Sequence, residues 1–348
     1  MSNNSTNKSG TIYFVEEQDQ LGFTTAGYLK IGLINENGHG RTSNDRKDEH
    51  QTGNPRPLIV VDSIDTTASV STLESLIHQC LTMHRHRGEW FVKPNGDHKQ
   101  FKEKSLELKK SLEELNSLER GLQEYTAIED SGEEIKEDSE ATDIHHELVE
   151  TTSTIQHIDD QKKLIEYKLR AIGGERMSDI TGICSYQLSK PIARFNKKEF
   201  QTDNPELFNK FAVNEISQTF RIRKGPGKRK NEELSQLKKL CEVQQLHGEE
   251  SPILIASKEA QGLHHEWLTL HTAREPLSSR KSYLTAKLKL ICGEKRGIEN
   301  VCSWSRSSKP NLKKSNLRDV SEELISKYIF TGEPTRKFII NPFRPYKF

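Results

Sequence analysis

The sequence contains no long apolar run. No segment approaches the roughly 20 consecutive apolar residues that a membrane-spanning helix needs, and the first residues, Met-Ser-Asn-Asn-Ser-Thr-Asn-Lys, lack the apolar core of a secretory signal. We therefore expect a cytoplasmic protein with no membrane partner. Hydrophobic residues make up only 32% of the 348 residues and charged residues 30%. This composition predicts two or three domains with small cores, a large polar surface and long exposed helices.

Cysteine is scarce, and its spacing forms no recognisable pair. The five cysteines are Cys80, Cys184, Cys241, Cys292 and Cys302, and no two of them form a Cys-x-x-Cys motif. An odd number of scattered cysteines argues against a structural zinc site and indicates buried thiols in a reducing compartment.

An excess of charge of one sign is also missing, since the formal net charge is +1. The charges are nevertheless unevenly placed: residues 221–230 are strongly basic, and residues 129–140 are strongly acidic. A near-neutral total can hide a basic surface, so the composition does not exclude DNA as a partner.

Short motifs follow one another between residues 11 and 91. Strands are expected at residues 12–15, 29–33 and 58–61, a loop at 38–44, and a helix opening at Ser71. The motifs in chain order are Thr11-Ile12-Tyr13-Phe14-Val15, Tyr28-Leu29-Lys30-Ile31-Gly32, a polar run from Arg46 through His50 to Asn54-Pro55, a helix carrying Glu74 and His78, and Arg85-His86-Arg87-Gly88-Glu89-Trp90-Phe91.

In this order and spacing the motifs resemble the GIY-YIG nuclease superfamily, over about residues 11–94. They are most similar to the branch of phage and mobile-element proteins that has Lys-Ile-Gly at the second motif and ends in Gly-Glu-Trp-Phe. The polar composition of residues 1–10 predicts a disordered tail. The resemblance implies an α+β protein with a small mixed-sheet nuclease domain (residues 11–96). It also implies a metal-dependent endonuclease that cuts DNA with Mg²⁺ or Mn²⁺.

By the family pattern Glu74 is the metal ligand. Magnesium keeps several of its waters and often takes only one or two protein carboxylates, so a single glutamate is chemically sufficient. Two other interpretations stay open: Glu74 is an ordinary surface glutamate, or it closes a capping box with Ser71 at the start of its helix.

Tyr13 and Lys30 match the positions that the family uses for the attacking water. Tyr13 would position or activate that water, and Lys30 stands where many members have a second tyrosine. Tyr28 lies on the same side of the strand as Lys30 by alternation and is a substitute candidate. The sequence leaves open which of these residues orients the water and which accepts its proton.

Arg46 and His50 lie four residues apart on an expected helix, so their side chains point the same way. Arginine offers a planar fork for the scissile phosphate, and histidine can bond a phosphate oxygen or relay a proton. Arg41 is the alternative if the long preceding loop shifts the register. The remaining motif residues, His78, Arg85 and the Gly88–Phe91 block, are expected to close the core and orient Glu74.

Beyond residue 101 the leucines recur every three or four positions, which predicts a long amphipathic helix, then an acidic loop (residues 127–142) and a second helix (residues 144–172). Several short segments reappear 118 or 119 positions later, including His145-His146-Glu147 as His264-His265-Glu266 and Ile183-Cys184-Ser185-Tyr186 as Val301-Cys302-Ser303-Trp304. We therefore expect two copies of one helical-hairpin-plus-β module, at residues 101–223 and 224–348. The adjacent histidines point apart on a helix and are expected to be structural or interface residues.

The second half of each copy is loosely similar to the C-terminal segment of YqaJ-type viral recombinase exonucleases, in which a helix ending in Leu-x-x-x-Ile-Gly precedes a small β region. The likeness implies a DNA-handling module without nuclease chemistry of its own. The matching residues are Leu169, Ile172, Gly173, Pro205, Phe211, Phe220 and Ile222 in the first copy, and Leu288, Ile291, Gly293, Tyr328, Arg336, Phe338 and Ile340 in the second.

The basic run at the junction of the copies is a candidate for contacts with DNA phosphates. Pro226 between two glycines excludes a helix there. The alternative is a linker kept soluble by its charge. The candidate DNA-binding residues are Arg41, Arg223, Lys224, Lys228, Arg229 and Lys230.

The sequence thus predicts a metal-dependent DNA endonuclease whose duplicated modules bind DNA or assemble the protein into homo-oligomers through their helices. The alternative is a DNA-binding or scaffold protein that keeps a nuclease fold without turnover.

Overall fold

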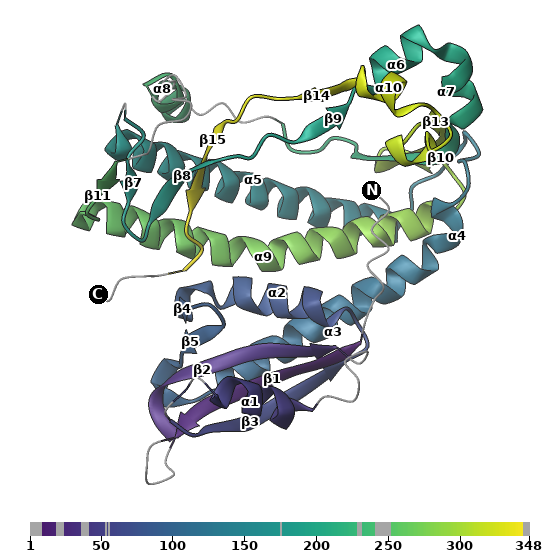
Figure 1. The fold of residues 1–348 in the computed structure, drawn as a ribbon. Coiled ribbons are helices and arrows are strands. Elements are labelled where there is room, and N and C mark those ends of the chain that lie inside the picture. Colours follow the sequence, from purple (N-terminus) through teal and green to yellow (C-terminus); the bar gives the residue numbers. More distant parts are fainter. Residues whose placement is uncertain are drawn as a thin grey trace.

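The computed structural model describes residues 9–18, 24–35, 42–52, 54, 56–174, 176–227, 232–240 and 252–343. The fold is mixed α+β, as expected, and has two regions (Figure 1). One is an N-terminal sheet with its helices. The other is a pair of long helices that carries two further small sheets. Among the described residues, no helix has the length and apolar character needed to cross a membrane.

The N-terminal sheet has the strand order β3-β1-β2-β5-β4. The strands are β1 (Gly10–Gln18), β2 (Thr24–Asn35), β3 (Leu58–Thr66), β4 (Arg85–Arg87) and β5 (Trp90–Val92), which include the three expected ones. All four pairings are antiparallel, so the expectation of a mixed sheet was wrong. The short connections from β1 to β2 and from β4 to β5 account for two of these pairings, because a parallel pair needs a long crossover. β1 starts at Gly10, one residue inside the expected disordered tail.

Helices cover both faces of this sheet. On one face Ile12, Phe14, Leu29 and Ile31 pack with α2 (Val70–Cys80) and with the first half of α3 (Lys99–Gly121). On the other face Tyr13, Val15, Ile34 and Leu58 form a smaller cluster beside α1 (Ser43–Gln51). The alternation of side chains along β1 sends Tyr13 to the α1 side and its neighbours to the α2 side.

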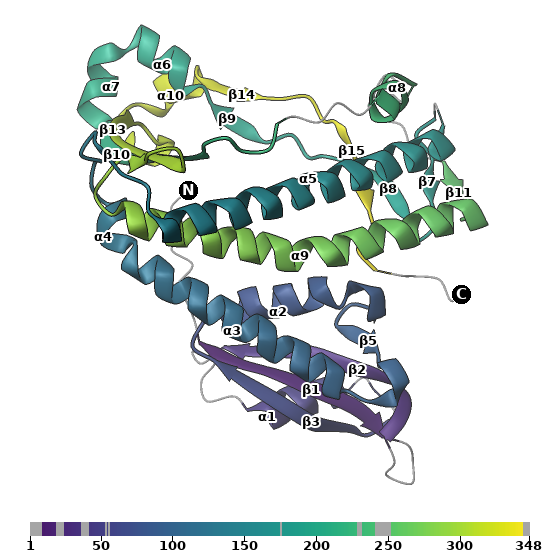
Figure 2. The ribbon, with the colours of Figure 1, turned by 180° about the vertical axis from the view of Figure 1, so that it is seen from behind.

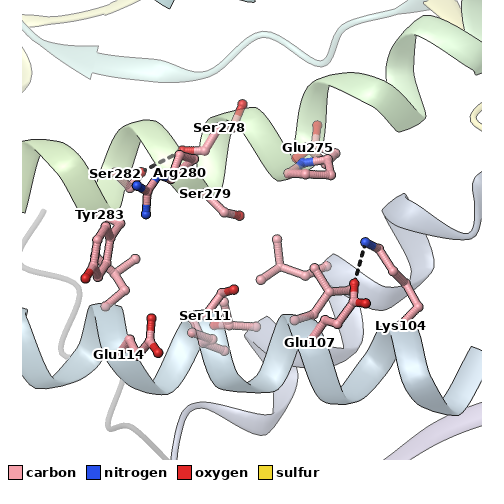
Figure 3. Close-up of a pocket in the computed structure, with 16 residues that line it drawn as sticks. Lys104, Glu107, Ser111, Glu114, Glu275, Ser278, Ser279, Arg280, Ser282 and Tyr283 are labelled. Atoms are coloured by element: carbon pink, nitrogen blue, oxygen red, sulfur yellow. Dashed lines mark hydrogen bonds and ion pairs between the residues drawn. The ribbon is translucent and has the colours of Figure 1, made fainter. Parts of the chain in front are cut away.

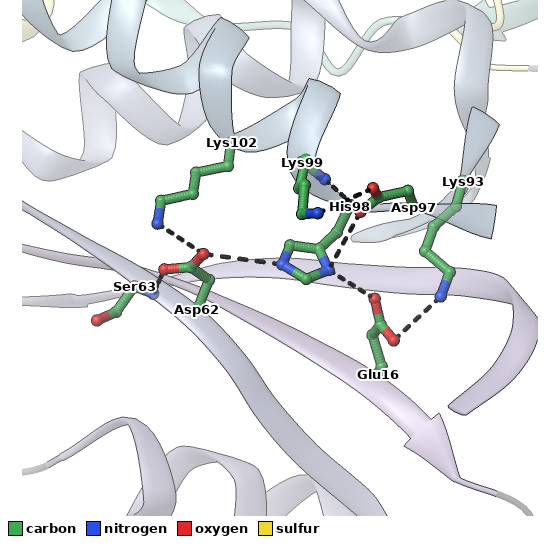
Figure 4. A network of polar contacts seen from close by, with 8 residues as sticks. All are labelled: Glu16, Asp62, Ser63, Lys93, Asp97, His98, Lys99 and Lys102. Atoms are coloured by element: carbon green, nitrogen blue, oxygen red, sulfur yellow. Dashed lines mark hydrogen bonds and ion pairs between the residues drawn. The ribbon is translucent and has the colours of Figure 1, made fainter. Parts of the chain in front are cut away.

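A buried network of ion pairs attaches the start of α3 to the sheet (Figure 4). Lys93 Nζ lies 3.0 Å from a carboxylate oxygen of Glu16, and both side chains are almost completely buried. His98 Nδ1 lies 3.1 Å from the other oxygen of Glu16, and Lys102 Nζ lies 2.8 Å from Asp62. Because a buried charge is costly unless it is paired, this network fixes how α3 leaves the domain.

The amphipathic helix expected after residue 101 is α3, and it serves both regions. Phe101, Leu108 and Leu112 belong to the core of the N-terminal sheet. Leu115 and Leu118 pack in a separate core with the long helix α9 (Lys258–Cys292). One continuous helix therefore joins the two cores, with the short α4 (Gln123–Thr126) after it.

A cavity of about 430 Å³ lies between α3 and α9 (Figure 3). Leu108, Leu112 and Leu115 of α3 line its apolar part, and Ser279 and Tyr283 of α9 lie opposite. The two regions therefore meet through packed contacts on either side of an unfilled space.

The C-terminal region is built on α5 (Ser139–Gly173) and α9, which run antiparallel side by side (Figures 1 and 2). Each has 35 residues, and their first residues are 119 positions apart. α5 begins earlier than residue 144, because the side chain of Asp138 caps the helix by accepting a hydrogen bond from the Ala141 amide.

A four-stranded sheet lies at each end of this helix pair. One has the order β10-β13-β12-β6, with β6 (Glu134–Ile135), β10 (Val213–Ile222), β12 (Gly297–Ile298) and β13 (Cys302–Asn311). The other has the order β11-β7-β8-β15, with β7 (Asp179–Ile180), β8 (Cys184–Leu188), β11 (Ile253–Leu254) and β15 (Arg336–Ile340). Each sheet takes strands from both residues 101–223 and residues 224–348.

The two sheets match strand by strand. Phe220 pairs with Trp304 in one sheet, and Phe338 pairs with Tyr186 in the other. Each sheet also has one parallel pairing, β12 with β6 or β11 with β7. A self-contained helical hairpin in each module was expected, and the structure differs: α5 packs mainly on α9 rather than on α3. The long apolar faces of α5 and α9 are buried against each other, which leaves no such hairpin.

The remaining elements complete this arrangement. α8 (Glu232–Leu240) packs on α5, as the second half of α3 packs on α9. A separate apolar cluster contains Phe200, Phe208, Leu317 and Tyr328. It joins α6 (Lys197–Asp203), α7 (Pro205–Phe211) and α10 (Glu322–Ser326), beside the strand pair β9 (Ala193–Phe195) and β14 (Ile329–Thr331).

Four of the five cysteines lie in the described part of the chain, and all four are buried free thiols, as expected. Cys241 lies outside the described residues.

Candidate active site

Tyr13 is placed by its pairing with Gly32. The two residues face each other across β1 and β2. A Cβ atom on residue 32 would lie 2.5 Å from Tyr13 Oη, so the glycine leaves the space that the ring occupies. Tyr13 is only 1% exposed, and its hydroxyl oxygen lies 3.2 Å from Nε2 of His50.

His50 and Arg46 approach Tyr13 from α1. This helix starts at Ser43 because Thr42 and Asp45 form a capping box. Arg46 forms an ion pair with Glu49, and its charge acts on the Tyr13 hydroxyl. Burial raises the pKa of Tyr13, and the charge of Arg46 opposes that rise. Burial and the nearby cations Lys30 and Arg46 lower the pKa of His50, which favours the neutral imidazole.

Lys30 lies on β2 and is almost completely buried at 6% exposure. Its ammonium group forms an ion pair with Glu89, the residue just before β5. Burial by itself would raise the pKa of the Glu89 carboxyl, but the hydrogen bond and charge of Lys30 outweigh it and lower that pKa. Tyr28, the substitute candidate, packs its ring against His86 with the centroids 4.9 Å apart.

Glu74 lies in the first turns of α2. The N-cap of this helix is Ser69, whose side chain accepts a hydrogen bond from the amide of Thr72, so the alternative of a capping box between Ser71 and Glu74 was wrong. Burial and the negative charge of Glu89 raise the pKa of Glu74 to about 7, against the opposing charges of Lys30, Arg85 and Arg46.

These side chains influence one another electrostatically although they start on opposite faces of the sheet. In the described part of the chain, β5 pairs with β2 only from Tyr28 to Lys30. Glu89 therefore sits where the pairing stops, within electrostatic reach of both Tyr13 and Glu74. We call this cluster the β2–β5 site. It comprises Tyr13, Lys30, Arg46, His50, Glu74 and Glu89.

The other motif residues hold the elements of the site together. His78 Nε2 lies 3.0 Å from the carbonyl oxygen of Ile31, and burial lowers the pKa of this histidine. A neutral ring can donate to the carbonyl and so ties α2 to β2. Nε of Arg85 donates to the carbonyl oxygen of Gly88 at 2.5 Å, and Phe91 is completely buried.

Glu89 is the functional candidate that sequence reasoning missed. It was grouped with the residues that close the core, and Arg85 with it. Both act on the pKa of Glu74. The available signal was an acidic residue inside an otherwise apolar motif, but its pairing with Lys30 depends on the register of β2 and β5.

The expected DNA-binding cations divide into two groups. Arg41, Lys228, Arg229 and Lys230 lie outside the described residues. Arg223 forms an ion pair with Glu134, and Lys224 lines a shallow hollow with His145, His146 and Glu150. Arg221, the first cation of the basic run, lies within β10 and not on the connection.

The repeated histidines have matching structural contacts. Nε2 of His145 lies 2.7 Å from the carbonyl oxygen of Arg223, and Nε2 of His264 lies 2.7 Å from that of Asn341. Within the described ranges, no group of three or more His, Cys, Asp or Glu side chains is arranged to hold a metal ion.

No known relative identifies the chain. No protein-family model, no curated protein and no solved structure matches it.

Proposed function

We propose that the protein is a metal-dependent endonuclease that hydrolyses DNA phosphodiester bonds. One observation carries this proposal: the five residues singled out by the resemblance to GIY-YIG nucleases come from β1, β2, α1 and α2 and act on one another in a single cluster. A set of unrelated surface residues would have no reason to converge in this way.

Glu74 is the residue that would hold a magnesium or manganese ion. Its carboxylate is disfavoured by burial and by the neighbouring Glu89. A divalent cation suits such a pair of carboxylates, since Mg²⁺ prefers oxygen ligands and would offset their repulsion. When bound, the metal would stabilise negative charge on the phosphate and on the leaving oxygen.

Tyr13 and His50 form the group that we assign to the attacking water. The lowered pKa of His50 favours its neutral form, so its Nε2 can accept a hydrogen bond from the Tyr13 hydroxyl. In that arrangement a lone pair of Tyr13 Oη is available to accept a hydrogen bond from the attacking water and to aim the water oxygen. Burial of the ring fixes the direction of this contact.

Arg46 and Lys30 supply positive charge at the same place. The Arg46 guanidinium extends from α1 toward Tyr13, where it could donate two hydrogen bonds to phosphate oxygens. Lys30 forms an ion pair with Glu89, whose charge acts on Glu74, and we assign Lys30 a positioning role.

We also infer that residues 101–223 and 224–348 descend from a duplication. Helices of equal length, sheets with equivalent registers and matching histidine contacts support this inference. In a homodimer of a single module, the two copies of its long helix would pack on each other across the subunit interface. In the duplicated chain, α5 and α9 make this contact within one molecule. The expected homo-oligomer would then need another surface, and light scattering on the pure protein would measure its mass.

The test of the catalytic proposal is a plasmid assay. Supercoiled DNA incubated with the protein and Mg²⁺ or Mn²⁺ should become nicked or linear, and EDTA should prevent it. Glu74→Gln, nearly the same size but uncharged, should lose this cleavage. Glu103→Gln is a matched control, because Glu103 is exposed on α3, outside the site. Equal cleavage by the parent and Glu74→Gln would rule out Glu74 as the metal ligand. DNA binding without cleavage by the parent would favour a non-catalytic binding protein.

A further inference from the structure

The strands β10 and β13 present two chemically different faces. They pair antiparallel over ten residues each. The inner face carries Phe220, Trp304 and Arg306, which pack toward the core at the end of α9. On the outer face hydroxyl-bearing residues stand opposite one another, Ser217 with Ser307 and Thr219 with Ser305.

This outer face is hollowed and basic. A depression of about 240 Å³ is lined by Ser217, Thr219, Arg221, Arg296, Ser303, Ser305, Ser307 and Lys309. We call these residues the β10–β13 face. It contains three cations and five hydroxyl groups, and none of its lining residues is acidic, apolar or aromatic.

The three cations of the β10–β13 face are exposed, and none forms an ion pair in the described part of the chain. Nearby cations behave differently, since Lys295 is paired with Glu133 and Lys313 with Glu215. Glu215 faces Lys309 across the strands, but its carboxylate is bound by Lys313 and Asn311. The positive charge of the face therefore remains available to a ligand.

The matching sheet acts as an internal control. There β8 and β15 have the same pairing, with Ser185, Gln187, Thr335, Lys337 and Ile339 at the positions of Ser303, Ser305, Ser217, Thr219 and Arg221. Ile339 thus stands where β10 has Arg221, although Lys337 stands where β10 has Thr219. Since the same pairing forms with isoleucine at this position, the architecture does not require the arginine at residue 221.

We propose that the β10–β13 face binds the phosphate backbone of duplex DNA. Arginine, lysine, serine and threonine are the side chains that contact phosphate oxygens and position a duplex without reading its sequence. The face offers no aromatic ring on which an unpaired base could stack, which favours duplex over single-stranded DNA. The choice of DNA rests on the proposed function, whereas the surface itself is separate from the β2–β5 site.

The experiment measures binding without cleavage. Glu74→Gln protein in EDTA is titrated against a fluorescently labelled duplex, and the affinity is followed over a series of salt concentrations. The test variant adds Arg221→Gln, Arg296→Gln and Lys309→Gln. The control variant adds Lys110→Gln, Lys258→Gln and Lys337→Gln, which removes the same charge from exposed positions elsewhere.

The test variant should bind the duplex at least about tenfold more weakly than the control. Its plot of log affinity against log salt should flatten by about 0.9 for each phosphate that the protein no longer neutralises, so by about 2–3 in total. A second variant, Arg221→Ile with Arg296→Ser, introduces the residues that the matching copy has 118 positions away, Ile339 and Ser178, and so controls for a folding defect. It should lose affinity in the same direction, and far-ultraviolet circular dichroism should be unchanged.

The outcomes separate the two proposals. Binding that depends on the β10–β13 face in a protein that never cleaves would overturn the endonuclease and leave the surface intact. Equal affinity and equal salt slope in test and control variants would overturn the surface proposal, whatever the cleavage assay gives. Tighter binding to single strands than to duplex, or binding to anionic vesicles in place of DNA, would also overturn it.

Discussion

Replacing Glu74 with glutamine should stabilise the metal-free protein at high pH while it removes activity. The ordinary pKa of a glutamate is 4.5, and burial with Glu89 raises that of Glu74 to about 7 in the folded state. The folded protein therefore binds an extra proton between these values, and its free energy of unfolding falls as pH rises through that window. Above about pH 7 the full penalty of the charged, buried carboxylate is present.

The size of the effect follows from the same shift. Each pKa unit corresponds to about 1.4 kcal/mol, so the shift from 4.5 to about 7 corresponds to at most about 3.5 kcal/mol. Glu74 is only partly buried, and water screens part of this penalty. The uncharged glutamine does not carry the penalty. Glu74→Gln should thus exceed the parent by about 1–3 kcal/mol near pH 8 and by almost nothing near pH 4.

Denaturant unfolding in EDTA at several pH values measures this difference. Glu103→Gln, exposed on α3, should show no such pH-dependent gain. Added Mg²⁺ or Mn²⁺ should then stabilise the parent but not Glu74→Gln, because only the parent keeps the ligand. A Glu74→Gln protein that is no more stable than the parent near pH 8 would refute the electrostatic argument, even if its activity were lost.

Four further changes test other parts of the structure. Tyr13→Phe should keep the fold, since the ring remains packed, and slow cleavage by about 10²–10⁴ in a plasmid assay. Gly32→Ala should cost about 1–3 kcal/mol in denaturant unfolding and also slow cleavage, because the new methyl meets the Tyr13 hydroxyl; unchanged stability would contradict the close approach. Lys93→Met should cost about 3–5 kcal/mol, since it leaves the charge of Glu16 buried without its lysine, and a loss below about 1 kcal/mol would count against the network. Arg46→Ala should reduce the cleavage rate with normal circular dichroism, and a normal rate would remove it from the site.

Local patterns in the sequence were sufficient for most secondary structure. The alternating strands around Tyr13 and Leu58 and the leucine stripe of α3 appear where expected, because side-chain periodicity is a property of neighbouring residues. Helix starts were less certain. Ser69 and Ser71 are both competent caps, and only the path of the chain from β3 into α2 decides that Ser69 accepts the bond.

The candidate site was partly visible in the sequence. Tyr13, Lys30 and Glu74 stand out by residue type and order, and the helix that carries Arg46 and His50 could be expected from the run after the loop. The position of Glu89 could not be predicted. Its contact with Lys30 joins residues far apart in the chain and depends on where the pairing of β2 with β5 ends.

The sequence by itself determined the periodicity of the strands and helices, the types of residue available for chemistry and the similarity between the two C-terminal stretches. Only the tertiary structure decided which strands pair with each other. Residues 101–223 and 224–348 carry the same apolar pattern, so the strands of each stretch could in principle pair among themselves and form a separate sheet. The antiparallel packing of α5 on α9 brings the end of one stretch beside the start of the β region of the other. That packing is a long-range burial of two apolar faces, and no local sequence pattern specifies the partner of such a face.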